Sequence, residues 1–471
     1  MSSVSSLNSL LSSSSSTSSI DLSSILEAAF GASSPGIDVT SAVNAAVTAA
    51  RAPEQAWQSQ ESTLQSQASA LTQIQTDAST LDNDVQELNS ITGPLSARSV
   101  TSSNSSVVSA SAASGTTAGN HVVVVNNLAT TASWTSGVFT SSSTLLPAGS
   151  FTITTGSGAT ATITTDGTQS LADVANQING DSLGLSASVV NDATGSRLAI
   201  VANTSGSTAN FTVGGTGSAS FGFTQAATGG NASLTVDGIT ISSATNTVTG
   251  VVPGLTLNLL SADPGVQVTL AVTPNTTQAA SAINQFVSDY NTVIKELSTQ
   301  FTFNGTSEGV LATDSSVRNL QSALMGSLGY TYTPTSGTTT VSNLSSLGIS
   351  VGNDGTLSVD ASALQSSLQN NFGDVQSFFQ GTSMNGFANS LDAQLTSFTS
   401  PGDGAFTVDL QSMNSQYSDL QNSINNFETN YITPLKAQLQ SEYSQAEILL
   451  QQLPAEMQQI NTELGLNNTK S

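Results

Sequence analysis

The sequence predicts an α+β multidomain protein, in which a β-rich head is inserted into a long, coiled-coil-like helical stalk formed by both chain ends. Both ends of the 471-residue chain carry glycine-free stretches with apolar residues at helical spacing, at 37–92 and 405–464. The middle alternates apolar and polar residues in short runs between turn residues, which is typical of β-strands. The stalk must therefore form from segments that are distant in the sequence.

The chain begins with a serine-rich segment, residues 1–35, which contains 16 serines. Such a polar segment cannot bury enough apolar surface to offset the entropy lost on ordering. We expect a disordered N-terminal segment.

The N-terminal part of the stalk is predicted at residues 36–100. Asp38 is a suitable N-cap, Pro53 should end or kink the first helix, and Gly93-Pro94 should stop the second. Beyond Pro53 the apolar residues follow heptads that predict a stalk seam, with Gln60 and Gln67 as polar members. The apolar positions are Trp57, Leu64, Leu71, Ala78 and Val85 on one row, and Ile74, Leu81 and Leu88 on the other.

The C-terminal part, residues 401–471, is predicted to supply the matching stalk helix and a tail. Its apolar residues alternate spacings of four and three: Phe406, Leu410, Met413, Tyr417, Leu420, Ile424, Phe427 and Tyr431. The spacing then becomes four throughout, and Pro434 lies inside this stutter. We expect a kink near Thr433 and an interruption of the helix at Pro434 and Pro454.

Three further regions are expected between these ends. Residues 101–148 and 230–280 should form a β-rich head domain, 149–229 a second head domain inserted in the first, and 281–400 stalk-associated helices with a β-hairpin. Asp237-Gly238 between alternating strands predicts one tight hairpin, and Asn353-Asp354-Gly355 predicts another.

Composition excludes several classes of function. The formal charge of −24, from 31 acidic and 7 basic residues, would repel nucleic acids and anionic lipids. With no cysteine there are neither disulfides nor thiolate metal ligands. No apolar run reaches the ~18 residues of a membrane helix, and the first basic residue is Arg51, which argues against a cleaved secretory signal. Export that reads an uncleaved, unfolded N-terminus remains open.

The residues for catalysis are missing, so we expect no enzyme, cofactor or metal site. His121 is the single histidine and lies in a valine-rich strand. The stretch 180–184 reads Gly-Asp-Ser-Leu-Gly, as in serine hydrolases, but a helix-like segment precedes it and no histidine follows. Asp82, Asp84 and Glu87 fall outside the apolar seam and predict a solvated helix face rather than a cation site.

Several ordered blocks resemble the flagellar filament cap family, also called hook-associated protein two. At the N-terminal end these are residues 36–41 and 49–53, followed by 102–112 and 122–129. Residues 170–179, 185–189 and 195–198 resemble a short motif shared by flagellar hook and flagellin-like proteins. The second half continues the pattern in order at 234–241, 246–248, 253–257, 286–291, 309–314 and 347–349.

The resemblance implies a secreted structural protein at the distal tip of the bacterial flagellar filament. There it would promote flagellin polymerisation, prevent loss of flagellin monomers, and be required for filament elongation and motility. Its implied partners are further copies of itself in a ring, expected to be a pentamer, flagellin, and the flagellar export apparatus with its chaperone. A host surface or mucin is a further partner that the head could bind, whereas nucleic acid and membrane insertion are not expected.

Two other readings remain open on the sequence alone. The protein could be an adhesin, in which case binding should survive in the isolated head, residues 101–280. It could also be another axial component, such as flagellin or a hook–filament junction protein, in which case the purified protein should form filaments. An enzyme would need a site that the sequence does not provide.

Overall fold

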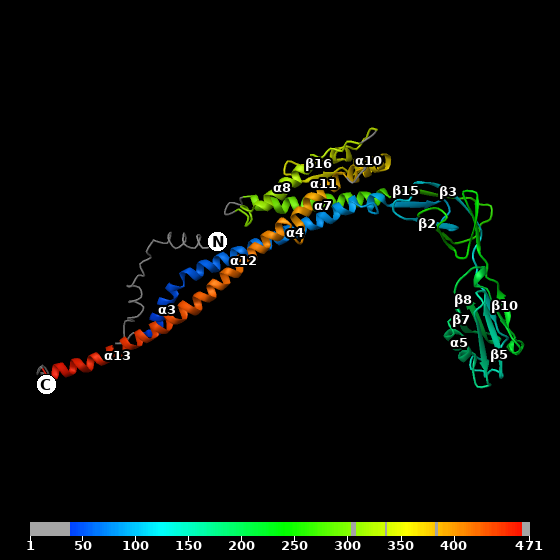
Figure 1. Ribbon diagram of the computed structural model, residues 1–471, viewed down its shortest axis with the longest axis horizontal. Helices are drawn as coiled ribbons and strands as arrows, with labels where there is room; N and C mark the ends of the chain where they lie inside the picture. The colour runs from blue at the N-terminus through cyan, green and yellow to red at the C-terminus, as the bar shows by residue number, and fades with distance from the viewer. Residues whose placement is uncertain (1–37, 303–307, 335–336, 382–384, 464–471) are drawn as a thin grey trace. The chain divides into compact units, whose positions relative to one another are not determined.

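The computed structural model describes residues 38–302, 308–334, 337–381 and 385–463 (Figure 1). The serine-rich segment expected to be disordered, residues 1–35, lies outside the described residues. The chain divides into two compact units, the first comprising residues 1–81, 291–325 and 393–471, and the second 82–290 and 326–392. Each unit is built from segments that are distant in the sequence. The boundaries between the units fall inside four helices, so each of these helices contributes residues to both units.

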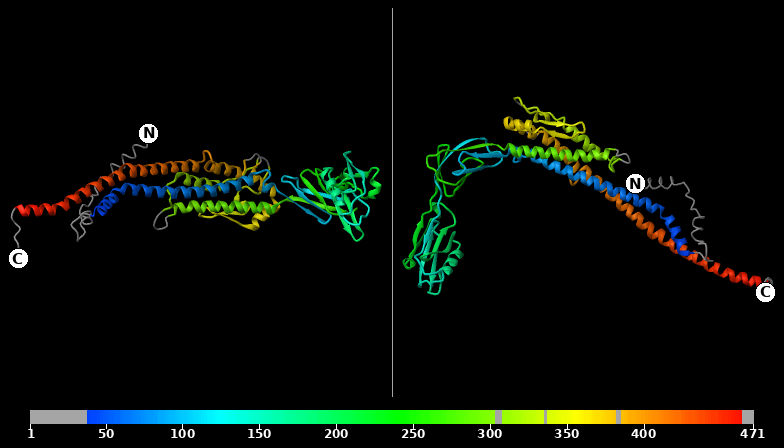
Figure 2. Two further views of the ribbon diagram at one scale, coloured as in Figure 1. Left: turned by 90° about the horizontal axis from the view of Figure 1, so that it is seen from below. Right: turned by 180° about the vertical axis from the view of Figure 1, so that it is seen from behind.

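The first unit is helical and joins the two ends of the chain. Within it α3 runs beside α13 and α4 beside α12 (Figures 1 and 2). The helices that lie in this unit or pass through it are α3 Val39–Ala50, α4 Ala52–Asn89, α7 Thr276–Phe301, α8 Ser315–Ser327, α11 Phe387–Thr399, α12 Ala405–Phe427 and α13 Thr433–Glu463.

Local sequence signals set the ends of the first helices. Asp38 caps α3 by accepting a hydrogen bond from the Ser41 backbone N–H at 3.1 Å, as the sequence predicts. The helical structure is interrupted at Arg51, between α3 and α4. Pro53 lies in the first turn of α4, where its missing N–H costs no helical hydrogen bond.

The C-terminal stalk helix is more continuous than the sequence predicts. A π-helical turn, Glu428–Ile432, joins α12 to α13 and places Pro434 in the first turn of α13. The irregularity expected near Thr433 is this wider turn, whose extra residue shifts the apolar face. The predicted interruption at Pro454 is wrong, because α13 continues through it to Glu463. The missing N–H removes one hydrogen bond there without ending the helix.

The second unit contains two β domains. The first has an antiparallel five-stranded sheet, in the order β1-β15-β3-β11-β12, and a three-stranded sheet, β13-β14-β2. Its strands are β1 Arg98–Ser102, β2 Val108–Ala112, β3 Gly119–Asn127, β11 Ala232–Val236, β12 Ile239–Ser243, β13 Thr247–Thr249, β14 Leu255–Leu259 and β15 Val268–Pro274. Asp237 and Gly238 both have positive φ, 51° and 82°, in the predicted hairpin between β11 and β12.

The inserted β domain has its own core and two sheets, β10-β4-β8-β7 and β6-β5-β9, with α5 packed on β7 (Figure 1). Its elements are β4 Ser133–Thr135, β5 Gly149–Thr155, β6 Thr160–Thr165, α5 Leu171–Gly180, β7 Leu185–Asp192, β8 Gly195–Ala202, η2 Ser207–Ala209, β9 Phe211–Gly214, α6 Ser218–Phe221 and β10 Thr224–Ala227.

The boundary predicted at residue 149 is about twenty residues too late. Ala132 and Leu146 belong to the same core as Phe151, and β4 pairs with β8 through Trp134 and Ile200. The inserted domain therefore begins near Thr130.

The rest of the second unit is a small helical and hairpin region. It contains η1 Pro94–Ser96, η3 Leu344–Leu347, β16 Ile349–Val351, β17 Leu357–Val359, α9 Ala361–Asn370 and α10 Phe372–Gln380. The second predicted hairpin is present, with Gly355 at a φ of 81°. The Gln380 amide donates to the carbonyls of Leu88 and Ser90 at 3.3 and 2.9 Å, which satisfies acceptors at the end of α4.

Candidate functional site

The stalk seam, the apolar stripe between α4 and α12, brings the two ends of the chain together. The Trp57 ring meets the Phe427 ring edge to face, with centroids 5.4 Å apart. Phe427 in turn stacks on Tyr431 at 5.1 Å. These rings fix the register of two helices that are far apart in the sequence.

The predicted seam residues differ in how deeply they lie. On α4, Leu71 and Ile74 are buried at the level of α12, whereas Trp57 and Leu64 are half-buried. The predicted seam residues Leu81, Val85 and Leu88 are also buried. The antiparallel register set by Trp57 with Phe427 and Gln75 with Thr407 places these three beyond the first residue of α12, so α12 does not extend alongside them. On α12, Leu410, Met413, Tyr417, Leu420, Ile424 and Phe427 are all half-buried. Tyr431 is 52% exposed, and its ring contact is with Phe427 of its own chain end. The lower part of the seam therefore leaves apolar surface in contact with solvent.

Uncharged polar side chains flank the seam. Gln65 donates to the Tyr417 hydroxyl at 3.0 Å, and Gln75 donates to the Thr407 hydroxyl at 3.1 Å. Gln67, predicted as a polar seam residue, instead donates to the Val310 carbonyl at 3.0 Å. Sequence reasoning missed Gln65 and Gln75, because a glutamine beside a heptad core looks like any solvated residue.

An ion-pair cluster lies where α3 meets α4. The Arg51 guanidinium is 2.6 Å from Glu54 and 2.7 Å from Glu428, so one arginine joins the two chain ends. The hydrogen bond to Glu428 is the main cause of a raised pKa for Arg51. Arg51 is the only basic residue before Arg98, and this isolation was the one available signal of a specific role.

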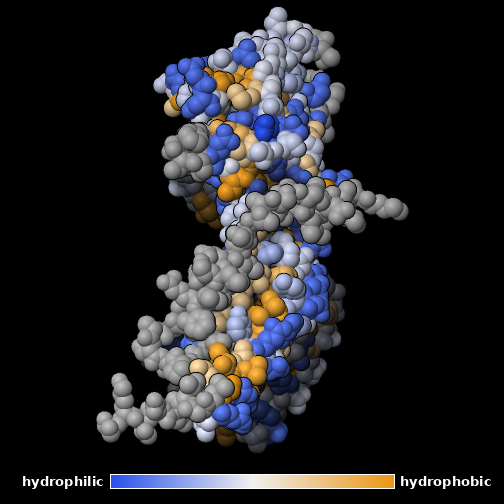
Figure 3. All heavy atoms as spheres, turned by 90° about the vertical axis from the view of Figure 1, so that its left-hand side faces the viewer, coloured by the Kyte–Doolittle hydropathy of each residue, from blue (hydrophilic) through white to orange (hydrophobic). Residues whose placement is uncertain are grey.

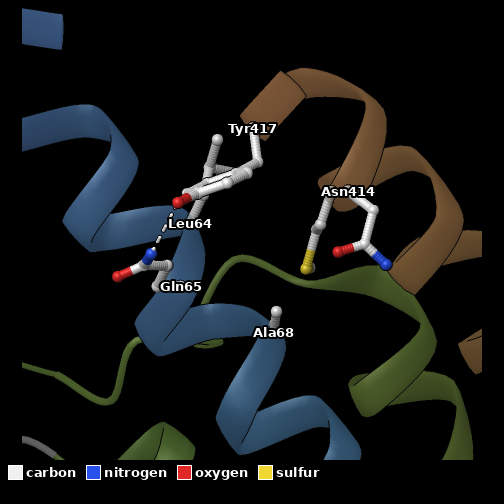
Figure 4. Close-up of a pocket in the computed structure, with 6 residues that line it drawn as sticks. Leu64, Gln65, Ala68, Asn414 and Tyr417 are labelled. Carbon is white, nitrogen blue, oxygen red and sulfur yellow. Dashed lines mark hydrogen bonds between the residues drawn. The ribbon is translucent and has the colours of Figure 1, made fainter. Parts of the chain in front are cut away.

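A pocket of about 290 Å³ opens in the seam between α4 and α12 (Figure 4). The residues that line it are Leu64, Gln65, Ala68, Met413, Asn414 and Tyr417. None of these six side chains is charged. The pocket thus offers an apolar floor with a neutral hydrogen-bonding rim.

The last helix, α13, carries an apolar stripe that the other described residues leave exposed to solvent. The first part of α13 is covered, because Leu439 and Tyr443 pack with α3 around Val43 and Val47. Beyond it Leu453 is 47% exposed and Met457 is 57% exposed. The space-filling view toward this end shows apolar surface among hydrophilic residues (Figure 3). Exposed apolar stripes of this kind mark interaction surfaces.

The acidic residues of α4 do not form the solvated face that the sequence predicts. Asp82 is only 8% exposed and Asp84 is half-buried, whereas Glu87 is exposed. Burial, followed by the hydrogen bond and charge of Asp289 and the charge of Glu87, raises the pKa of Asp84 to about 7. The prediction failed because α7 covers a second face of α4, which a heptad pattern cannot indicate.

The other singled-out residues show no arrangement for catalysis. His121 Nδ1 lies 2.8 Å from Asp237, and this contact lowers the pKa of the Asp237 carboxyl. The Gly-Asp-Ser-Leu-Gly stretch follows α5 and precedes β7, which reverses the strand–turn–helix order of a nucleophile elbow. Within the described ranges, no three His, Cys, Asp or Glu residues are grouped to hold a metal ion. No helix there is long and apolar enough to cross a membrane.

Comparison with known families gives matches over most of the chain. Residues 229–455 match the profile described as the C-terminus of flagellar hook-associated protein 2, and 35–132 match the profile of its N-terminus. Residues 150–204 match the flagellin hook IN motif.

Individual proteins give the same result. The chain is 28% identical to flagellar hook-associated protein 2 of Aeromonas caviae over 395 residues, which are 78% of this chain and 84% of that protein. It is 27% identical to the B-type protein of Pseudomonas aeruginosa over 72% of this chain and 77% of that one. The crystal structure of domains D1 to D3 of the Escherichia coli flagellar cap protein aligns with a TM-score of 0.60 and 26% identity, covering 73% of this chain and 99% of that one.

Leu81→Asp should loosen the stalk. Leu81 is fully buried, so an unpaired carboxylate there should lower the free energy of unfolding by about 2–4 kcal/mol. Thermal unfolding followed by circular dichroism measures the loss. Thr80→Asp, at the exposed neighbouring position, is the control and should change the melting temperature little. Equal melting of Leu81→Asp and the parent would contradict the burial of Leu81 in the helical core.

Asp84→Asn should remove a loss of stability that the parent shows as pH rises from about 4 to about 7. Asp84 ionises near pH 3.8 in the unfolded chain, whereas the folded protein holds this proton up to a pH of about 7. Proton binding therefore favours the folded state, and the free energy of unfolding falls as pH rises from 3.8 through about 7. After allowance for solvent screening, we expect roughly 1–3 kcal/mol less stability at pH 8 than at pH 5 in the parent, and a flatter profile in Asp84→Asn.

Denaturant melts at the two pH values test this expectation. Asn83→Ala, an exposed change beside Asp84, is the control and should shift stability equally at both pH values. An identical pH dependence in Asp84→Asn and the parent would refute the assignment.

Proposed function

Because this chain belongs to the flagellar hook-associated protein 2 family, whose members cap the flagellar filament, we propose that it forms a ring at the distal tip of a bacterial flagellum and promotes flagellin addition there. It is an exported structural protein of filament assembly and motility. The proposal extends to how this chain makes its contacts, to the number of copies and to its export.

The observation that carries the proposal is the pair of apolar surfaces that the stalk leaves uncovered. The exposed stripe of α13 includes Leu449, Leu453 and Met457, and the pocket between α4 and α12 opens in a half-buried seam. A helix with such a stripe gains stability by burying it. Neighbouring copies and the filament end supply the partner surfaces in the proposed assembly.

The charge of the chain restricts where copies can meet. At a formal charge of −24, copies repel one another over most of their surface. The pocket lining is uncharged. On α13 the exposed apolar residues lie among glutamines, but Glu447 and Glu456 also flank them. The pocket therefore allows approach with little electrostatic repulsion, and contacts at the α13 stripe rest on its apolar side chains, which together support self-association through the stalk.

We extend the proposal to a ring of five copies that holds flagellin at the filament end. Residues 1–35 are assigned to the export apparatus and its chaperone, because their serine-rich composition suits an export route that reads unfolded chain.

A ring held by the exposed stripe of α13 should tolerate salt and fail when the stripe is charged. Salt screens the repulsion between acidic copies, so the mass measured by light scattering should not fall between ~0.05 and 1 M NaCl, and electron microscopy should show closed rings. Replacing both Leu453 and Met457 by Asp should give monomers with unchanged melting, since both side chains are exposed. Gln452→Asp on the same helix is the matched control and should leave the ring intact. Rings that dissociate at high salt would overturn this contact.

A chain beginning at Gly36 should fold but not function. The removed residues carry too little apolar surface to stabilise a core, so circular dichroism and melting should match those of the full chain. In cells that lack their own cap protein, the full chain should restore filament growth and swimming, and the shortened chain should not. If the full chain fails while it is exported, the capping function is refuted. Full-length filaments from the shortened chain would remove only the role assigned to residues 1–35.

A further inference from the structure

The polypeptide crosses between the two β domains twice, and the two crossings are paired with each other. Thr130 leaves the first domain and Gly230 returns to it. The Thr130 N–H donates to the Gly230 carbonyl at 2.9 Å, and the Gly230 N–H donates to the Thr130 hydroxyl at 2.9 Å. Two adjacent strands alone would still allow the inserted domain to swing, because relative motion is the default for domains joined by short connections.

Two asparagine side chains fasten the crossings to their own domains. Asn246 accepts from the Ala129 N–H at 2.7 Å and donates to its carbonyl at 3.0 Å. Asn210 accepts from the Gly229 N–H at 2.8 Å and donates to its carbonyl at 2.8 Å. Each side-chain amide thus pairs with one backbone residue as a neighbouring strand would, through one donated and one accepted hydrogen bond. Asn246 holds the outgoing crossing to the first domain, and Asn210 holds the returning crossing to the inserted domain.

A third asparagine joins the domains directly. Asn231, just before β11, accepts from the Ser207 N–H of the inserted domain at 2.8 Å and donates to the Ser242 hydroxyl of β12 at 3.0 Å. Beside it the Ser205 hydroxyl donates to the Ala244 carbonyl at 2.7 Å. The loop 205–207 of the inserted domain is therefore bonded to the first domain at two points outside the covalent crossings.

Close packing at Gly206 leaves no space for a hinge. Gly206 has a φ of 105°, and its N–H donates to the Thr130 carbonyl at 3.0 Å. A Cβ at this position would lie 2.8 Å from the Ala244 Cβ. The backbone of the inserted domain thus touches the first domain where only a glycine fits.

We propose that these residues form a clasp that makes the two β domains one rigid body. The clasp consists of Asn210, Asn231, Asn246 and the loop 205–207, with Gly206 as its contact point. All its hydrogen-bonding groups are uncharged, so neither pH nor salt loosens it. In an exported protein the head keeps its geometry under external conditions that the cell does not control. This inference concerns the head alone and does not depend on the proposed capping function.

Distance measurements between spin labels test the clasp in the full-length protein. The chain has no cysteine, so Ser111→Cys on β2 and Ser188→Cys on β7, both exposed, give one label in each domain. Labelled chains are diluted with unlabelled ones, so that only distances within one chain are recorded. The parent should give one narrow distribution that is unchanged between ~0.05 and 1 M NaCl.

Asn231→Ala should widen this distribution about twofold or more, because it removes the direct bond to Ser207. The matched control is Asn179→Ala, since Asn179 makes the same paired hydrogen bonds to Ala187, at 2.8 and 2.9 Å, but within the inserted domain. The control should lower the melting temperature and leave the width unchanged.

Two results overturn the proposal: a broad distribution in the parent, or an unchanged width in a folded Asn231→Ala protein. If Asn231→Ala does not fold, Ser205→Ala decides instead. It removes only the bond to the Ala244 carbonyl and should widen the distribution by a smaller factor. No widening in Ser205→Ala would then reject the clasp.

Discussion

The contact between the first and last helices of the chain is the constraint on which the rest of the structure depends. Gln65 and Tyr417, hydrogen-bonded across the seam, are 352 residues apart in the sequence. Closing so long a loop costs conformational entropy, which the buried side chains of α4 and the ring contact of Trp57 with Phe427 must offset. Every other domain is therefore an insertion between two paired ends.

Hydrogen bonds between uncharged polar groups make most of the polar contacts beside the seam and at the joint between the β domains. The seam is flanked by glutamines that donate to hydroxyl and carbonyl oxygens, and the joint between the β domains is held by asparagines. A chain with 31 acidic and 7 basic residues has few partners for its carboxylates. Hydrogen bonds between uncharged groups hold over a wide range of salt and pH, which suits a protein that works outside the cell.

The exception is the acidic part of α4, where carboxyl groups are buried close to one another. Asp84 is placed against Asp289 with Glu87 nearby, and both neighbours add to the effect of burial in raising its pKa. Burial favours the protonated form of Asp84, and its ionisation places a negative charge close to Asp289 and Glu87 in a poorly solvated position. A carboxyl group on a solvent-exposed helix face would keep its ordinary pKa. The packing of α7 against α4 is therefore what raises the pKa of Asp84.

The sequence by itself determined the fold class, the two heptad stretches and both hairpins, because periodicity and turn residues act locally. Asp38, Pro53 and Asp237-Gly238 all serve the local roles that their chemistry predicts. Family membership also followed from ordered sequence blocks.

Only the tertiary structure decided which helix faces are covered. It buried Asp82, let α13 continue through Pro454, began the inserted domain near Thr130 and created the pocket beside Ala68. These features depend on which distant segment lies against each face, and a one-dimensional pattern does not contain that information. A heptad records that one face is apolar, but the neighbours of the remaining faces are set by the packing of the whole chain.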